Sequence, residues 1–423
     1  MQSIKQTRKE ITMVSVKQNK TKKLTVSSLA VLAMCLYAIM TSVHYINPAL
    51  SIFNSLSLYA FLGLSVAVVL LNKKIKLDVY WMWYLGFILM ALISTFYAPN
   101  QKASFNGIYN LVVVFGIIFS MSVVLTCIER VEMLMNSIVL GATVLMVYLI
   151  VTGEIDLSAE QTDRLGQELT GNANVFAFIY TIAACSSVYF LISKKNIFLK
   201  IFYLAPFIVH MLALALSGSR KNFLVPLIVL FITLLLKKDK HGKRHVIIWT
   251  IVGTVGLALV FYALMNIPAL YETVGNRFET LFEYSSGASN TSDGSTLERE
   301  QMRKNAIELW IQSPIFGNGF DSFSQLGSFG VYSHCNYTEL LCNHGLIGIV
   351  YYYSIWIYLL FRMIMCKNEH PMKNFLIGII IGFLICDYGS VSYALPLMHT
   401  FLLFASKFLM MSGSHDVSKL SQV

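Results

Sequence analysis

The second half of the chain carries arginines placed where they could hold an anion beside a membrane. Arg220 follows Ser217-Gly218-Ser219 and lies between two short apolar runs. An arginine at membrane depth is costly unless it is paired, and such residues mark functional sites. The alternative is an interfacial arginine whose side chain extends to the lipid headgroups. Because the short flanking runs would draw Arg220 toward the interior of a helical bundle, we favour a functional role.

Three further arginines, Arg277, Arg299 and Arg303, lie in one long polar segment. Guanidinium groups bind phosphate oxygens in pairs and remain charged at physiological pH. The alternative is local ion pairing, because Glu298 and Glu300 lie within one helical turn of these arginines. The spacing favours ion pairing for Arg303, whereas for Arg299 the two interpretations are equally supported.

His334 could act as a base, because it lies just before an apolar run and an imidazole exchanges protons near neutral pH. An ordinary interfacial histidine is the alternative. Glu339 and Asp387 are acids in predicted membrane spans, where they could orient a neighbour or carry protons. His344, about three helical turns beyond His334, is expected to be a hydrogen-bonded residue of the bundle. His210 could be either a functional residue or a hydrogen-bonded residue of the bundle.

Motifs for metal and nucleotide chemistry are absent from the sequence. There is no Walker A pattern, no HExxH, no DxD and no cluster with metal-ligand spacing. Gly317-Asn318-Gly319 lacks a strand–loop–helix context and predicts a turn. We therefore expect no metal and no cofactor. If the protein handles a phosphate leaving group, arginine must neutralise the developing charge.

The composition indicates a membrane protein. The 423 residues are 56% hydrophobic and 13% charged, with a mean hydropathy of +0.64, whereas soluble domains are about 25% charged. Apolar runs long enough to cross a bilayer recur along the chain. In a soluble protein the net charge of +10 would suggest nucleic acid. Here the basic residues lie at helix ends, where they set orientation, so we expect no nucleic-acid partner.

The apolar runs predict an all-α polytopic fold with about 12 transmembrane helices. The runs lie near residues 25–44, 53–72, 79–97, 107–127, 132–152, 172–193, 201–217, 222–236, 246–266, 337–361, 374–391 and 394–411. The short seventh and eighth could instead form one buried hairpin. The expected organisation is a basic tail (1–24), spans 1–9 (25–266), a large loop between spans 9 and 10 (267–336), spans 10–12 (337–411) and a second tail (412–423).

The distribution of positive charge predicts the orientation. If the N-terminus is cytoplasmic, 24 of the 32 Lys and Arg residues lie inside, and only eight lie outside. The outside residues are Lys102, Arg164, Arg220, Lys221, Arg277, Arg299, Arg303 and Lys304. An even number of spans then places both termini in the cytoplasm and the large loop outside.

The large loop is expected to contain a helix. Residues Thr296–Ser313 read as amphipathic, and Pro314 ends the pattern. The small polar residues at 287–296 predict a mobile stretch. The apolar side of the helix would be formed by Met302, Ile307, Leu309, Trp310 and Ile311.

Four segments together resemble the O-antigen ligase and polysaccharide polymerase superfamily. They are Arg164-Leu165-Gly166 with Gly171-Asn172-Ala173-Asn174; Leu216-Ser217-Gly218-Ser219-Arg220; Ser295-Thr296-Leu297-Glu298-Arg299 with Trp310 and Pro314-Ile315-Phe316-Gly317-Asn318-Gly319; and His334-Cys335-Asn336-Tyr337-Thr338-Glu339-Leu340-Leu341 with Gly345-Leu346-Ile347-Gly348. The last two are fairly specific in order and spacing. The resemblance covers about residues 150–360, and the first five spans contribute only hydrophobicity.

The resemblance implies a GT-C-like glycosyltransferase that moves a glycan from a polyprenyl-diphosphate carrier to an acceptor, with inversion and without a metal. Arg220 and Arg299 match the diphosphate-binding arginines of the family, and His334 matches the histidine thought to take the proton of the acceptor hydroxyl. Cys335 and His344 depart from the usual residues, which leaves the orientation of His334 open. Further candidates for substrate binding or support are Arg164, Arg277, Asn336 and Glu339.

Within the superfamily, a polymerase and a ligase share this chemistry and differ in acceptor. We favour a polysaccharide polymerase for capsule or exopolysaccharide, acting on undecaprenyl-diphosphate-linked oligosaccharides in the bacterial cytoplasmic membrane with its site on the outer face. The alternatives are an O-antigen-type ligase and, in another class, a transporter of polysaccharide or lipid-linked oligosaccharide. The expected partners are the bilayer, both lipid-linked substrates, a flippase and a chain-length regulator.

Overall fold

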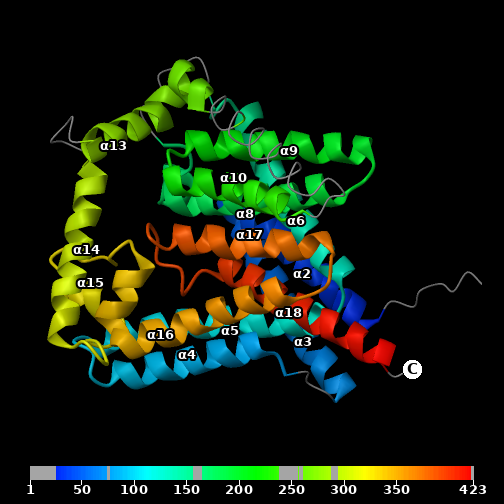
Figure 1. The fold of residues 1–423 in the computed structure, drawn as a ribbon, viewed down its shortest axis with the longest axis horizontal. Coiled ribbons are helices and arrows are strands. Elements are labelled where there is room, and N and C mark those ends of the chain that lie inside the picture. Colours follow the sequence, from blue (N-terminus) through cyan, green and yellow to red (C-terminus); the bar gives the residue numbers. More distant parts are fainter. Residues whose placement is uncertain are drawn as a thin grey trace, which may run out of the picture.

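The computed structural model describes residues 25–73, 77–155, 164–237, 256, 261–286 and 294–420. All regular secondary structure in these ranges is helical. Figure 1 shows a bundle in which most long helices follow the long axis of the molecule. The bundle helices are α2 (Val26–Val43), α3 (Ser51–Asn72), α4 (Val79–Thr95), α5 (Gln101–Val124), α6 (Ile128–Val151), α8 (Ala173–Ser193), α9 (Ile197–Leu216), α10 (Arg220–Leu235), α16 (Asn336–Met365), α17 (Pro371–Cys386) and α18 (Pro396–Leu420).

Seven of the described helical segments are long and apolar enough to cross a membrane, and α4 and α17 are shorter apolar helices. The prediction of a polytopic helical membrane protein is confirmed. The number of spans stays a prediction, because most of the run near 246–266 and the tail 1–24 lie outside the described residues.

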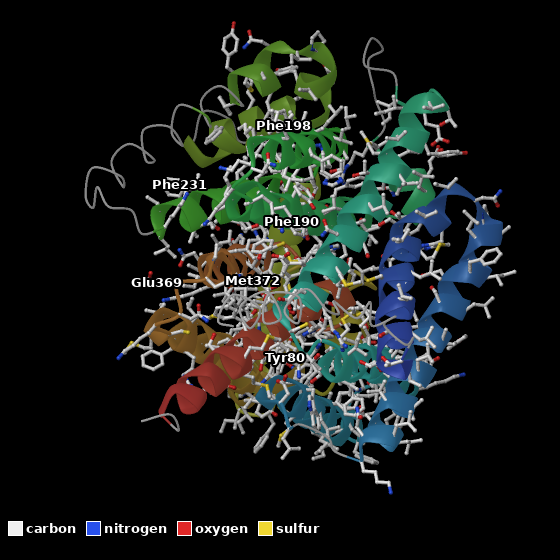
Figure 2. The ribbon with its side chains drawn as sticks, turned by 90° about the vertical axis from the view of Figure 1, so that its right-hand side faces the viewer. Tyr80, Phe190, Phe198, Phe231, Glu369 and Met372 are labelled. Carbon is white, nitrogen blue, oxygen red and sulfur yellow. The ribbon has the colours of Figure 1, made fainter. Side chains whose placement is uncertain are left out.

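α8 lies at the centre of the bundle, whereas α3 and α9 lie at its periphery. The apolar window of α8 is 83% buried, whereas those of α3 and α9 are only 22% and 17% buried. Figure 2 labels one side chain of the buried helix α8, Phe190, and one of the exposed helix α9, Phe198. Phe190 is fully buried and Phe198 is 77% exposed. The apolar outer surface of α9 suits a helix that faces lipid rather than water.

The predicted large loop is mostly helical and crosses one end of the bundle. α13 (Asn276–Ser286) and α14 (Gly294–Gln312) lie across that end, and α18 ends at the opposite end (Figure 1). We call the described residues 267–286 and 294–335 the cap. Its elements are α12 (Pro268–Leu270), η3 (Tyr271–Gly275), α13 (Asn276–Ser286), α14 (Gly294–Gln312) and α15 (Ser322–Leu326). Most of the stretch predicted to be mobile, 287–293, lies outside the described residues.

The predicted helix Thr296–Ser313 is present as α14, but its apolar side differs from the prediction. Met302 and Ala306 are buried against a small cluster of the cap and α16. Ile307 and Ile311, which were expected on the same buried side, are 40% and 64% exposed. The helix packs through a narrow face because it rests on one end of the bundle rather than inside it.

α16 is interrupted at Gly345, whose φ of 63° is left-handed. The turn at 314–319 fits into the interruption, and the carbonyl oxygen of Pro314 accepts a 2.9 Å hydrogen bond from the amide of Leu346. The two backbones approach so closely that a Cβ on Gly345 would lie 2.4 Å from the carbonyl oxygen of Ile315. Glycine is required here because both the angle and the spacing exclude a side chain. The predicted turn therefore joins the cap to the bundle.

Candidate active site

A cleft of about 930 Å³ lies between the cap and the ends of α10 and α17. Among the described residues that line it, Glu300 is the one carboxylate, against a large excess of positive charge. The basic residues of the lining are Arg164, Arg220, Lys221, Arg277, Arg299, Arg303 and Lys304. All four arginines singled out as binding candidates thus face one cavity, which we call the basic cleft.

Arg220 links the bundle to the cap. It begins α10 directly after the turn in which Gly218 has a φ of 65°. Its guanidinium donates to the backbone carbonyl of Arg277 at 2.6 Å and to the hydroxyl of Thr296 at 2.8 Å. The alternative of an arginine extending to headgroups does not fit these contacts, because the side chain lies in the cleft wall.

The loop before α8 is tied to the same turn. Arg164 donates from Nε to the carbonyl of Ser217 at 2.8 Å and from Nη2 to the side-chain oxygen of Asn174 at 3.3 Å. The hydroxyl of Ser219 donates to the same Asn174 oxygen at 2.9 Å. Asn172 accepts from the backbone amide of Asn174 and caps α8. The Asn-x-Asn pair therefore uses its first residue as a helix cap and its second as a site residue.

Arg299 and Arg303 reach the basic cleft from α14. The predicted ion pair of Arg303 is not what the structure shows: its guanidinium lies 4.9 Å from the ring centre of Tyr388, and Glu300 pairs with Lys304 at 2.8 Å. A guanidinium over an aromatic ring is held by the charge distribution of the ring. Arg303 thus fastens the cap to the turn after α17 while it lines the cleft.

His334 lies beside the basic cleft, on the wall of a second cavity of about 370 Å³. Lys221 and Asn174 line both cavities and stand between them. The backbone of His334 is left-handed, with a φ of 57°. Such a conformation is uncommon for residues other than glycine and persists where the surroundings enforce it. The ring of His334 lies 4.4 Å from that of Tyr332.

The imidazole of His334 is neutral near pH 7. Burial, with the positive charges of Arg299 and Lys221, lowers the pKa of His334 from 6.5 to about 4. A neutral imidazole has a free nitrogen lone pair and can accept a proton. The same cations that could hold an anion thus keep the histidine in its basic form.

Glu339 fixes the chain before His334. Its fully buried carboxylate accepts from the backbone amide of Ser333 at 2.7 Å and from the side chain of Asn343 at 3.1 Å. Glu339 lines neither cavity. Of the roles open to it, supporting the loop fits this position.

Asn336 fixes the chain after His334. Its backbone amide donates to the carbonyl of Asp387 at 2.8 Å, and its side-chain oxygen accepts from the amide of Ser392 at 3.0 Å. Its side-chain nitrogen donates to Tyr353, whose hydroxyl donates to the Asp387 carboxylate at 2.8 Å. With anchors on both sides, the left-handed conformation of His334 is explained by its neighbours.

Two other histidines belong to the bundle. His210 is buried and lies 3.1 Å from the hydroxyl of Thr143. His344 was expected to be hydrogen-bonded, and this is wrong for the described residues. It is buried between the rings of Phe87 and Phe320, and neither ring nitrogen has a hydrogen-bond partner there. Neither histidine lines the two cavities.

Sequence reasoning missed the position of Lys221. Its ammonium donates to the backbone carbonyl of Gly389 and it lines both cavities. The only signal in the sequence was its place directly after Arg220 in an outside segment. Its contact with the turn after α17 is non-local and could not be read from the chain.

The arrangement is suited to a multiply charged anion. Bidentate guanidinium groups match phosphate oxygens, and a cleft with many cations and one acid attracts such a ligand. In the described part of the chain, no group of three or more His, Cys, Asp or Glu side chains is placed to hold a metal ion. The arginines that line the basic cleft can bind a diphosphate, and His334 can receive a proton.

Two comparisons with known proteins bear on this site. Residues 205–353 match the family model described as O-antigen ligase. An uncharacterized protein of Haemophilus influenzae is 26% identical over 215 residues, which are 48% of this chain and 52% of that protein. The chain thus spans about half the length of the curated relative that it matches. The matched region includes Arg220, Arg299 and His334, and the resemblance drawn from the sequence motifs is confirmed.

Proposed function

We propose that this chain, whose residues 205–353 match the family model described as O-antigen ligase, is a polysaccharide polymerase. It transfers a growing glycan from a polyprenyl-diphosphate carrier to a sugar hydroxyl of a lipid-linked repeat unit. The observation that carries the proposal is the basic cleft beside His334, with Lys221 between the cleft and the second cavity. The protein acts in the bacterial cytoplasmic membrane, with the cap on the outer face.

The donor diphosphate binds in the basic cleft, held chiefly by Arg220 and Arg299. Neutral His334 takes the proton of the acceptor hydroxyl as its oxygen attacks the anomeric carbon. The bond between that carbon and the phosphate oxygen breaks, and its electron pair leaves with the diphosphate. Fixed arginines stabilise the growing negative charge at that point. Attack from the face opposite the leaving group inverts the anomeric centre, and no metal takes part.

Donor binding should also change the pKa of His334, the proposed base. Arg299 and Lys221 lower the pKa of His334 in the empty cleft. A bound diphosphate neutralises these charges, so the pKa of His334 rises toward the range in which a general base works well. The base thus becomes stronger when the leaving group is in place.

The description of the matching family, O-antigen ligase, favours a ligase as the second candidate. A ligase would use the same cleft and the same base and would differ in the acceptor. The two functions separate by product, since a polymerase makes a ladder of repeat lengths from the repeat unit alone.

The test is transfer in proteoliposomes that contain the purified protein and the lipid-diphosphate repeat unit. We expect a ladder from the wild type that survives EDTA and disappears in His334→Ala and Arg220→Ala. Arg362→Ala, an exposed arginine at the other end of α16, is the matched control and should keep the ladder. Transfer to a different added acceptor without a ladder would indicate the ligase. Uptake or flipping of the substrate without any bond formation would indicate a transporter.

A further inference from the structure

The second cavity has a polar mouth and an apolar floor. His334, Lys221 and Asn174 lie where it meets the basic cleft. Deeper, its lining includes Ile117 of α5 and Leu397 of α18. The cavity therefore joins the proposed reacting centre to apolar side chains of the bundle.

The far wall of this cavity comes from the first two helices of the bundle. α2, η1 (His44–Ile46) and α3 contribute Tyr37, Thr41, His44, Tyr45 and Asn54. None of these residues lies in the region that matches the family model, 205–353. The match covers the proposed diphosphate-binding arginines and the base, whereas this wall is built from another part of the chain.

The wall offers hydrogen-bonding capacity that the described protein does not use. The side-chain oxygen of Asn54 is shielded from solvent and has no hydrogen-bond partner among the described residues. An unsatisfied buried acceptor is costly, so such an atom suggests a ligand or water that donates to it. Nearby, Tyr37 stacks on Phe61 with ring centres 6.4 Å apart, which holds its ring in the wall.

The floor offers apolar contact. The hydroxyl of Thr400 is engaged, since it lies 2.9 Å from the carbonyl of Pro396 and 3.4 Å from the sulfur of Met121. Beyond His334 and Lys221, the basic residue in the lining is His44, whose Nδ1 lies 2.7 Å from the carbonyl of Met40. Among the described residues, none that lines this cavity carries a carboxylate. A ligand that fills this space is polar toward His334 and uncharged toward the floor.

We propose that this cavity binds the acceptor sugar and that the α2–α3 hairpin selects it. This inference rests on the proposed function. The acceptor is a neutral sugar ring with an apolar edge, such as the methyl group of a deoxysugar or of an N-acetyl group. A hydroxyl donates to Asn54, and the reacting hydroxyl faces His334. The volume of about 370 Å³ is at the lower end of small-ligand sites, which run from about 300 to 1,000 Å³.

The experiment measures acceptor and donor dependence separately with Asn54→Ala and Tyr37→Phe. We expect the KM for acceptor to rise about tenfold in Asn54→Ala, the scale of one lost hydrogen bond, with the KM for donor unchanged. Tyr37→Phe keeps the ring and its stacking, so it folds as the wild type does and tests the hydroxyl alone. Tyr59→Phe, on the lipid-facing side of α3 and 68% exposed, is the matched control.

A rise in the KM for donor, with that for acceptor unchanged, would overturn the assignment. A second measurement does not need turnover: saturation-transfer NMR of soluble oligosaccharides with the purified protein. Neutral N-acetylated or deoxy sugars should bind to the wild type, and their binding should weaken in Asn54→Ala. If the wild type binds such sugars but transfers nothing, the proposed function fails and the sugar site stands. If the wild type transfers glycans normally, but Asn54→Ala and Tyr37→Phe have the same KM for acceptor as the control Tyr59→Phe, the proposed sugar site is wrong while the proposed function stands.

Discussion

Arg220 shows how one side chain serves both the fold and the proposed chemistry. Its guanidinium bonds the backbone of α13 at Arg277 and the hydroxyl of Thr296 on α14, so it holds the cap over the cleft that it lines. Arginine has five donors in a planar fork and can keep such contacts while it binds an anion. The sequence predicted a functional role for this residue, but not its bonds to the cap, because these depend on segments far along the chain.

The variant Arg220→Lys tests whether the positive charge at this position is sufficient for transfer or whether the planar geometry of the guanidinium is also needed. Lysine keeps the charge but cannot form two bonds in a fixed plane. We expect transfer, as kcat/KM, to fall about 100-fold, in line with the loss of one preorganised donor at a reacting centre. Arg362→Lys should have no effect. An activity equal to that of the wild type in Arg220→Lys would show that positive charge alone is sufficient.

The lowered pKa of His334 predicts the acid limb of the pH profile. The free protein should lose kcat/KM as pH falls through about 4, because protonation removes the base. Arg299→Gln removes one of the charges that lower this pKa, so the same limb should move to higher pH. A limb that stays in place in Arg299→Gln would contradict the electrostatic coupling of the two residues.

The lowered pKa of His334 also makes the stability of the folded protein depend on pH. The pKa of His334 is lower in the folded state than the unfolded value of 6.5, so between about pH 4 and 6.5 the unfolded chain binds the proton more readily. The contribution to stability is complete above pH 6.5 and is lost as pH falls toward 4. In His334→Gln, the thermal unfolding temperature should decline less over this range than in the wild type.

Among the elements, the junction of the 314–319 turn with α16 shows what the sequence could and could not predict. Pro314 and the glycines predicted a helix end and a tight turn, and both are present. The break in α16 at Gly345 was not foreseen, because it exists only where the turn approaches. The apolar face of α14 was misjudged for the same reason, since packing at the end of a bundle buries fewer residues than a core helix does.

Gly345→Ala should disturb this junction. The new Cβ would lie 2.4 Å from the carbonyl oxygen of Ile315, and the left-handed backbone is strained for alanine. We expect a loss of about 1–3 kcal/mol of unfolding free energy, measured by thermal unfolding in detergent. Gly116→Ala, in the interior of α5 with nothing within 4 Å of the added carbon, is the control and should be neutral or stabilising. Equal melting of the two variants would contradict the tight approach.

At the scale of the whole molecule, composition and apolar periodicity were enough for the fold class, since lipid as solvent allows few alternatives. The N-terminal hairpin was read as hydrophobic spans only. Its cavity-lining residues, such as Tyr37 and Asn54, are ordinary types. Only the packing of α2 against α6 and of α3 against α5 gives them a cavity that they share with residues of α5 and α8. The convergence of the arginines likewise needed the cap to be in place.

The charge distribution predicts that the cap lies outside the cell and the opposite end of the bundle inside. Gln325 is exposed on the cap. Glu369, labelled in Figure 2, is exposed between α16 and α17, which meet at the end of the bundle opposite the cap (Figure 1). A membrane-impermeant thiol reagent on intact cells should label Gln325→Cys, and should label Glu369→Cys only after permeabilisation. The reverse pattern would invert the topology.

The most direct test of the central claim measures donor binding and turnover in the same preparations of purified protein. In the proposed mechanism, Arg220 and Arg299 bind the diphosphate and His334 removes the proton. His334→Ala should therefore bind polyprenyl diphosphate as the wild type does while its transfer rate falls by about 100- to 10,000-fold. The double variant Arg220→Gln/Arg299→Gln should lose binding. Full turnover without His334, or unchanged diphosphate binding without the two arginines, would contradict the account.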